Sequence, residues 1–247
     1  MKEFLFALQF LTIIPVKVKK MDENKFAASL IYFPLIGCFL GALLAGVRLL
    51  ASFLNLTTTS TSIIMIILLI FLTGGIHLDG LADTTDAILS RKNKEEMLGI
   101  MRDPHIGTMG ALSVISILLL KIAFLVSIDV SLQTRALLLM CILSRWSLVL
   151  SLYFFPYARK EGKARLFKEK INLKIYLLAT LITLVAVTEL LKFKGLLIFT
   201  VVGGAAFLLG RFFQKHLGGI TGDTLGAINE VSEVIVLLCF CIFGLAS

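Results

Sequence analysis

Three aspartates near the end of an apolar stretch could together bind a metal ion. Asp79, Asp83 and Asp86 occur at helical spacing, directly after Gly74-Gly75-Ile76-His77-Leu78. On a helix they would lie within about 60° of one face, where three like charges repel one another unless a cation lies among them. Ligands that offer only oxygen favour a hard ion. We therefore predict a site for Mg²⁺, or alternatively Mn²⁺; the competing interpretation is a solvated helix end without metal.

A second acidic cluster, formed by Asp223 and Glu230, leads into another apolar stretch. The two residues are two helical turns apart and share a face with Gly226, so a neighbouring helix or a ligand could approach closely there. Gly80 gives the first cluster the same property. Asp223 also follows a glycine-rich turn, where the alternative role is a helix N-cap. A cap does not explain a glutamate in an apolar helix, because a carboxylate there needs a partner that offsets its desolvation.

Three arginines are candidate partners for phosphate. Arg102 lies beside Asp103 in a loop, and Arg159 follows the end of an apolar stretch. Arg145 lies inside that stretch and needs an anion, either a phosphate or one of the carboxylates. Guanidinium groups bind phosphate oxygens in a bidentate manner, and a bound metal ion neutralises a diphosphate. The combination favours phosphoryl or nucleotidyl-diphosphate chemistry, and the sequence contains no serine-hydrolase elbow, Walker A motif or dinucleotide-binding glycine pattern.

Membrane helices must position these residues. Of the 247 residues, 58% are hydrophobic and 16% are charged, and the apolar residues occur in blocks of about twenty, the length that crosses a bilayer as a helix. We predict an all-α fold, a polytopic membrane helical bundle in one domain (1–247). Its N-terminal segment, 1–28, is expected to lie in the membrane interface. The seven predicted spans are residues 29–54, 60–78, 107–128, 135–155, 173–191, 195–213 and 230–246.

The distribution of positive charge predicts the orientation. Most of the 24 lysines and arginines fall in alternate loops, which places the N-terminus in the cytoplasm and both acidic clusters at the cytoplasmic ends of spans. The net charge of +8 is explained by this rule and by anionic lipid headgroups. Without a basic patch interleaved with aromatic residues, nothing indicates a nucleic-acid partner. The expected location is a cytoplasmic (inner) membrane, with the active site facing the cytoplasm and the lipid bilayer as a partner.

Several sequence blocks resemble the cobalamin synthase family, the adenosylcobinamide-GDP ribazoletransferases of prokaryotes. They are residues 32–37 (Tyr-Phe-Pro-Leu-Ile-Gly), residues 74–84, residues 218–227, and Arg102-Asp103 with the Gly-Thr pair at 107–108. The blocks occur in the family's order from the N-terminal segment to the last span. The string His-Leu-Asp-Gly-Leu-Ala-Asp-Thr is long and unusual, which makes the match specific. One departure is Ala87, where a glycine is expected; it leaves all three aspartates in place.

The resemblance implies a reaction. A hydroxyl of α-ribazole, or of α-ribazole 5′-phosphate, attacks the phosphate on the aminopropanol arm of adenosylcobinamide-GDP; GMP leaves and adenosylcobalamin or its 5′-phosphate is formed. It also implies that metal held at the first cluster neutralises the diphosphate, with the second cluster completing the site. The implied residues are Asp79, Asp83, Asp86, Asp223 and Glu230 for the metal, Asp86, Asp223 or His77 as the proton acceptor, and Arg102, Asp103, Arg145, Arg159 and Thr221 for the substrates.

Two other functions would use similar residues. CDP-alcohol phosphotransferases also have an acidic Asp-Gly cluster at the membrane surface, but the Ala-Arg of their signature is absent, because Asp83 follows Ala82. A cation transporter would need carboxylates near the bilayer midplane. The sequence leaves open which carboxylate is the base, how many metal ions bind, whether the acceptor carries a 5′-phosphate, the oligomeric state, and any association with other cobalamin-assembly enzymes.

Overall fold

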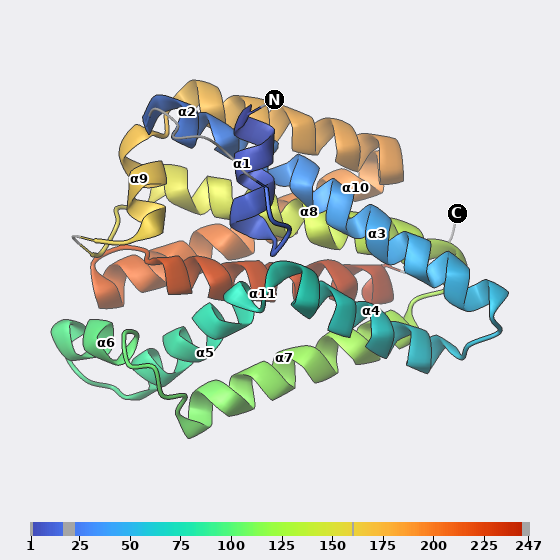
Figure 1. Ribbon diagram of the computed structural model, residues 1–247, viewed down its shortest axis with the longest axis horizontal. Helices are drawn as coiled ribbons and strands as arrows, with labels where there is room; N and C mark the ends of the chain where they lie inside the picture. The colour runs from blue at the N-terminus through green and yellow to red at the C-terminus, as the bar shows by residue number, and fades with distance from the viewer. Residues whose placement is uncertain (1, 17–22, 160, 244–247) are drawn as a thin grey trace.

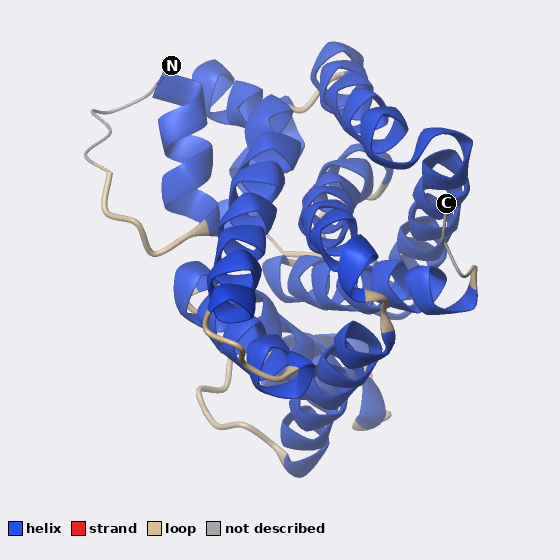
Figure 2. Cartoon of the chain, turned by 90° about the vertical axis from the view of Figure 1, so that its right-hand side faces the viewer, coloured by secondary structure: helices blue, strands red, loops and turns tan. Residues whose placement is uncertain are grey.

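The computed structural model describes residues 2–16, 23–159 and 161–243, and these residues form helices, with no strand beyond one isolated bridge. Figure 1 shows the long helices lying side by side, and Figure 2 shows the same helices, joined by loops, from a perpendicular direction. The all-α prediction is confirmed. The elements are α1 (Lys2–Leu11), α2 (Glu23–Ala28), η1 (Ser29–Tyr32), α3 (Phe33–Phe53), α4 (Thr58–Thr73), α5 (Ile76–Leu89), α6 (Lys94–Ile100), α7 (Thr108–Ser127), α8 (Val130–Phe154), α9 (Lys163–Lys170), α10 (Leu173–Leu217) and α11 (Gly222–Ile242).

The helices account for about seven membrane spans, as predicted. Five of them, Phe26–Phe53, α7, α8, α10 and α11, are long and apolar enough to cross a membrane, and α4 with α5 forms a bent pair that adds a sixth. The 45-residue α10 leaves helical geometry at Lys192, so it consists of two limbs. In Figure 1 these limbs run in opposite directions. Counting each limb as one span gives the seventh.

The second span ends earlier than residue 78, where the sequence placed its end. α4 stops at Thr73, Gly74 and Gly75 adopt positive φ values of 64° and 68°, and α5 departs at 88° to α4. Two successive left-handed residues are tolerated at low cost only as glycines. His77 and the three aspartates therefore belong to a separate helix, which turns away from the direction of the span.

α8 is the central helix of the bundle. In its most apolar stretch 83% of the residues are buried, and α3, α10 and α11 all pack against it. Trp146 illustrates this packing: its indole stacks at a tilt on Phe199, with ring centroids 4.2 Å apart, and its Nε1 donates to Thr180 Oγ1 at 3.0 Å. A polar group on such a buried helix costs free energy unless it has a partner, and Thr180 is the partner of the Trp146 indole.

The N-terminal helix α1 packs on the bundle through buried Ala7 and Leu11, against η1 and α3. Its phenylalanines join an aromatic cluster around Phe167 of α9, whose ring lies 4.9 Å from that of Phe10 and 5.7 Å from that of Phe33. In Figure 1 α1 crosses the direction of the long helices. The interfacial location of residues 1–28 stays a prediction; residues 17–22 lie outside the described part of the chain.

Candidate active site

α5 and α11 meet where the two acidic clusters begin, and glycines allow the contact. A Cβ atom on Gly80 would lie only 2.7 Å from the carbonyl oxygen of Asp223, and one on Gly226 would lie 2.9 Å from that of His77. Any side chain at either position would therefore push the helices apart. The close approach expected from these two glycines is confirmed. Because of it, Asp79 of α5 and Asp223 of α11 belong to one site.

A short backbone link positions Arg159 against Asp223. Ala158 N donates to Ile220 O, and Ile220 N donates to Pro156 O, both at 2.8 Å, which joins the segment after α8 to the turn before α11. The Arg159 guanidinium then lies 2.8 Å from Asp223 Oδ2. Both side chains are largely buried, so this ion pair is screened less than a surface pair. Asp223 lies in the first turn of α11, which begins at Gly222 rather than near residue 230 as the sequence predicted.

Three aspartates share the resulting site. Among the charges around Asp83, those of Asp79 and Asp223 act on it most strongly, and Asp79 also acts on Asp223. At Asp83 the repulsion from each of these aspartates is stronger than the attraction of Arg159, whereas at Asp223 the attraction of Arg159 is stronger than the repulsion from Asp79. Tyr157 lies beside this group; burial raises the pKa of its phenol, and the Arg159 cation lowers it. The phenol thus remains a neutral hydrogen-bond donor near the carboxylates at neutral pH.

Two cavities meet at Asp79. The first, of about 230 Å³, has aromatic walls; we call it the aromatic cavity. The second, of about 910 Å³, is the open cavity, and Phe10, Ile76 and Asp79 line both. The aromatic cavity is lined by Phe10, Phe33, Ile76, His77, Asp79, Leu148, Leu152, Tyr157, Arg159, Gly162, Ala164, Phe167, Gly222, Asp223, Leu225 and Gly226. The open cavity is lined by Gln9, Phe10, Thr12, Ile13, Thr73, Gly74, Gly75, Ile76, Leu78, Asp79, Ala82, Asp83, Met101, Arg102, Asp103, Pro104, Ile106 and Val114.

The structure therefore brings two predicted substrate-binding residues, Arg102 and Asp103, to the cavity that contains Asp79 and Asp83. Asp103 accepts hydrogen bonds from the backbone N of His105 at 3.0 Å and from its ring Nδ1 at 2.6 Å. These bonds hold the pKa of Asp103 below its usual range. Because Asp103 is exposed, it remains an anion at neutral pH beside the exposed Arg102.

Asp86 has a structural task in this arrangement. Its Oδ2 accepts from Gly107 N and its Oδ1 from Gly110 N, both at 2.7 Å. Gly107 is the N-cap residue of α7 and supplies no side-chain cap of its own, so Asp86 satisfies the free amides from the neighbouring helix. Thr221, a predicted substrate-binding residue, is similarly engaged: it is fully buried and caps α11 by accepting from Thr224 N at 3.1 Å.

We expect Asp86→Asn to lower stability. The amide can accept only one of the two hydrogen bonds and brings no charge to the N-terminus of α7, so the loss should be about 1–2 kcal/mol in unfolding free energy. Thermal unfolding of the purified protein in detergent checks this, with Thr85→Val on the same helix as control, since among the described residues the Thr85 hydroxyl bonds only to the carbonyl oxygen of Leu81. An unchanged Asp86→Asn melting temperature would contradict the capping role.

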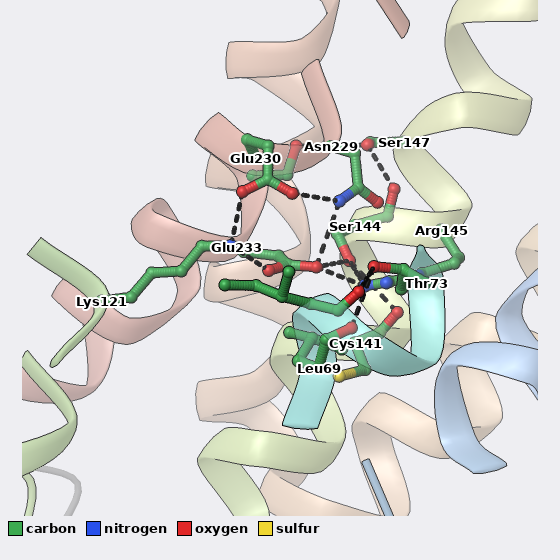
Figure 3. Close-up of polar contacts among 12 residues, drawn as sticks. Leu69, Thr73, Lys121, Cys141, Ser144, Arg145, Ser147, Asn229, Glu230 and Glu233 are labelled. Atoms are coloured by element: carbon green, nitrogen blue, oxygen red, sulfur yellow. Dashed lines mark hydrogen bonds and ion pairs between the residues drawn. The ribbon is translucent and has the colours of Figure 1, made fainter. Parts of the chain in front are cut away.

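Glu230 and Arg145 lie in a second group of polar residues, between α7, α8 and α11, which Figure 3 shows. Lys121 Nζ of α7 lies 2.6 Å from Glu230 Oε2 and 2.5 Å from Glu233 Oε2. Arg145 Nη1 of α8 pairs with the other oxygen of Glu233, and Asn229 Nδ2 donates to that oxygen at 3.1 Å. All of these side chains are buried. The anion that Arg145 needs is thus Glu233, and the carboxylate of Glu230 is engaged by Lys121.

This buried ion network, Lys121, Arg145, Glu230 and Glu233, is closed. It contains two acids and two bases, and the cavity beside it measures only about 10 Å³, too small for a substrate. His77 lies between the network and the site: it lines the aromatic cavity, and it is close enough to Arg145 and Glu233 for their charges to act on its ring. Its Nδ1 has no hydrogen-bond partner among the described residues, although only 7% of His77 is exposed.

The aspartates of the site are the candidate ligands of a divalent metal ion. Among the described residues no group of three or more His, Cys, Asp or Glu side chains is arranged to hold a metal ion. Mg²⁺, however, is usually held by one or two carboxylates together with substrate phosphates and water. Asp79 and Asp83, which repel each other and both line the open cavity, fit that requirement. Asp86 and Glu230 are occupied by other partners.

Sequence reasoning missed several residues of the site. Lys121 of the polar group between α7, α8 and α11, and Tyr157, Phe10 and Phe167 of the aromatic cavity, are not among the predicted site residues. The lysine carried a usable signal, because a lone base in an apolar helix needs an acid on another helix. The aromatic residues carried none, since phenylalanine is common throughout this sequence, which contains 19 of them.

The fold and the site define a class: a polytopic membrane protein with aspartates and arginines lining two adjoining cavities at one end of its bundle. The family model described as cobalamin-5-phosphate synthase matches residues 3–241. The chain belongs to this family. The match does not favour the two alternatives, a phospholipid-headgroup transferase or a cation transporter.

Relatives are similar over nearly their whole length. An adenosylcobinamide-GDP ribazoletransferase of Desulforamulus reducens is 36% identical over 94% of this chain and 92% of its own. The proteins of the same name from Roseiflexus sp. and Herpetosiphon aurantiacus are 38% and 39% identical, over 94% of this chain and 86% and 92% of theirs. No solved structure matches the chain.

Proposed function

We propose that the protein is an adenosylcobinamide-GDP ribazoletransferase. It moves the adenosylcobinamide phosphate moiety from adenosylcobinamide-GDP to α-ribazole or α-ribazole 5′-phosphate and releases GMP. The observation that carries the proposal is the meeting of two cavities at Asp79, with Asp223 and Arg159 in one and Asp83 and Arg102 in the other. A transfer between two substrates needs two binding spaces that share one reacting centre, and this arrangement supplies them. The family's relatives carry that name.

The residues divide the work of the reaction. The acceptor hydroxyl oxygen forms a bond to the phosphorus next to the corrinoid arm, the bond from that phosphorus to the GMP oxygen breaks, and the hydroxyl proton leaves. Asp223 takes the proton, since it borders the aromatic cavity and Asp86 is already engaged by two amides. Arg159 and Arg102 bind phosphate oxygens and stabilise the charge that develops on the departing GMP.

Mg²⁺, or Mn²⁺, would be held by Asp79 and Asp83. When bound, such an ion neutralises the negative charge of the diphosphate and so makes its phosphorus easier to attack. The support is chemical: two carboxylates that repel each other beside an arginine-lined cavity are a poor arrangement unless a cation joins them. The ion would then complete its shell with phosphate oxygens and water.

The proposed reaction is tested with purified protein in detergent or lipid. We expect adenosylcobinamide-GDP and α-ribazole to yield GMP and adenosylcobalamin in equal amounts when Mg²⁺ is present. Chelation should reduce the rate by about 10³-fold or more, because the diphosphate charge is then uncompensated, and added Mg²⁺ should restore it. CDP-alcohol acceptors serve as the control and should give no product. Full activity in metal-stripped protein would contradict the metal assignment while leaving the transfer reaction intact.

We also propose that the site faces the cytoplasm from a cytoplasmic membrane. Two residues of the positive loops lie at the end of the bundle that holds the site: the Lys94 side chain lies against Gly218, just before α11, and Arg159 lies in the cavity itself. In Figure 1 the α3–α4 connection lies at the opposite end. Cytoplasmic loops carry the excess of lysine and arginine.

Cysteine labelling in intact cells checks this orientation. In a background lacking the four native cysteines, Asn55→Cys should react with a membrane-impermeant maleimide added outside, and Arg91→Cys should react only after the cells are opened. Both positions are exposed, so burial does not bias the comparison. The reverse labelling pattern would invert the topology and place the site outside the cell.

A further inference from the structure

The two cavities differ in chemistry as well as in size. The aromatic cavity takes most of its apolar lining from α1, α3, α8 and α9, including Phe10, Phe33 and Phe167. Its charged groups, Asp79, Asp223 and Arg159, come from α5, α11 and the segment after α8. Phe33 and Phe167 are each only 1% exposed, so their rings are held in place by packing. An occupant would therefore have an aromatic, apolar part against these rings and an anionic or hydroxyl-bearing part toward the charges.

We propose, on the basis of the function above, that the aromatic cavity binds the acceptor riboside and the open cavity binds the corrinoid donor. α-Ribazole is a riboside of a dimethylated benzimidazole, whose base has no hydrogen-bond donor and therefore loses little by entering an apolar space. Its ribose hydroxyls would point toward Asp223, and a 5′-phosphate would be bound by Arg159. The unpartnered Nδ1 of buried His77 offers one further polar contact in the same cavity.

The guanosine half of the donor is the competing occupant, and it fits less well. Guanine carries donors and acceptors along its edge, and each of these loses its partners in water when the base is buried against phenylalanine and leucine. The open cavity supplies polar side chains instead, from Gln9, Thr12 and Asp103 as well as Arg102. A volume of about 230 Å³ also excludes a corrinoid ring from the aromatic cavity, whereas the open cavity of about 910 Å³ can accept part of the donor.

Filling each cavity in turn tests the assignment. Ala164 of α9 is 5% exposed and lines only the aromatic cavity, so Ala164→Phe should raise the KM for α-ribazole by ~10-fold or more and change the KM for adenosylcobinamide-GDP by less than about 2-fold. Val114→Phe in the open cavity should do the reverse. Glu169→Gln is the control: Glu169 lies on the exposed side of the same helix and lines neither cavity, so the change should leave both constants unchanged. Thermal unfolding in detergent shows whether each variant is folded.

Product inhibition of the unaltered protein gives an independent measurement. GMP should compete with adenosylcobinamide-GDP and inhibit noncompetitively against α-ribazole, because the nucleotide and the acceptor would occupy different cavities. GMP that competes with α-ribazole, or an Ala164→Phe variant whose donor KM rises instead, would overturn the assignment and give the aromatic cavity to the nucleotide. Failure of the unaltered protein to form cobalamin would overturn the proposed function instead, so the two failures are distinguishable.

Discussion

Asp223→Asn and Asp79→Asn should each abolish transfer while the protein remains folded. Asp223 borders the aromatic cavity and pairs with Arg159 at 2.8 Å, and Asp79 lines both cavities, so each faces the reacting phosphate in the proposed complex. Asparagine keeps the shape but can neither accept the hydroxyl proton nor bind a cation as strongly. We expect turnover to fall about 10³-fold in each variant, measured as GMP release at saturating substrate.

The stability of these two variants should differ. Asp79→Asn removes a like charge from the neighbourhood of Asp83 and Asp223, so its melting temperature without metal should be unchanged or higher. Asp223→Asn also removes the partner of Arg159, so its melting temperature should rise less than that of Asp79→Asn or fall slightly. Combining the two should cost little more activity than either alone, as for groups that act as a unit.

A matched control for these variants is Glu169→Gln in α9. Glu169 forms an i,i+4 ion pair with Arg165 on the surface, where 44% of its side chain is exposed, so its removal should leave activity unchanged. Near-normal turnover in Asp223→Asn would mean that Asp223 serves only the ion pair with Arg159. The reacting centre would then be confined to α5 and the loop that carries Arg102.

The span count could be predicted from the sequence because it depends on length and apolarity alone. The ends of the spans could not. The stretch from α4 into α5 stays apolar through Leu78, so hydropathy gives no reason to stop at Thr73; the break comes from the left-handed conformations of Gly74 and Gly75. The start of α11 was missed for a similar reason. Its first turns contain Asp223 and glycines, which lower the hydropathy there, so hydropathy alone does not show that the helix has begun. Its N-cap is Thr221.

The residues of the site likewise fall into those that the sequence could predict and those that it could not. The helical spacing of Asp79 and Asp83 and the small residue at Gly80 are local features. They predicted the shared face and the close approach of a neighbouring helix or a ligand, which the structure identifies as α11. The partners of Asp86 and Glu230 are not local. Asp86 bonds to amides of another helix, and Glu230 pairs with Lys121, more than a hundred residues away in the chain. Periodicity cannot say which of several carboxylates a distant base or amide will engage.

The aromatic cavity shows a further limit of prediction from the sequence. The short apolar segment at the N-terminus matched a helix lying in the membrane interface, since it is too short to span. In the structure its Phe10 also forms a wall of both cavities and stacks with Phe33, with ring centroids 6.0 Å apart, a role that the sequence did not indicate. A phenylalanine that faces lipid and one that faces a cavity look the same in a sequence, because both are apolar positions on a helix.

The buried ion network should dominate the stability of the bundle. Glu233→Gln leaves Lys121 and Arg145 facing the single carboxylate of Glu230, in a place where Glu233 is only 1% exposed. Breaking a buried pair by removing one partner costs about 3–5 kcal/mol, because an uncompensated charge remains inside. We expect a large drop in melting temperature in detergent, accompanied by lower yield in the membrane. Lys121→Met should behave in the same way, since it leaves two glutamates with one base.

Restoring neutrality separates charge balance from simple loss of contacts. Lys121→Met combined with Glu230→Gln removes one charge of each sign and leaves the Arg145–Glu233 pair, so the double variant should be more stable than Lys121→Met alone. Arg135→Gln is the control: it removes an exposed arginine from the same helix as Arg145 and should change the free energy of unfolding by no more than about 0.5 kcal/mol. A double variant less stable than Lys121→Met would show that the individual hydrogen bonds, rather than neutrality, hold α7 against α11. Activity measured on the double variant at a temperature where it is folded should stay close to normal, because the network is closed and none of its four residues lines the two cavities.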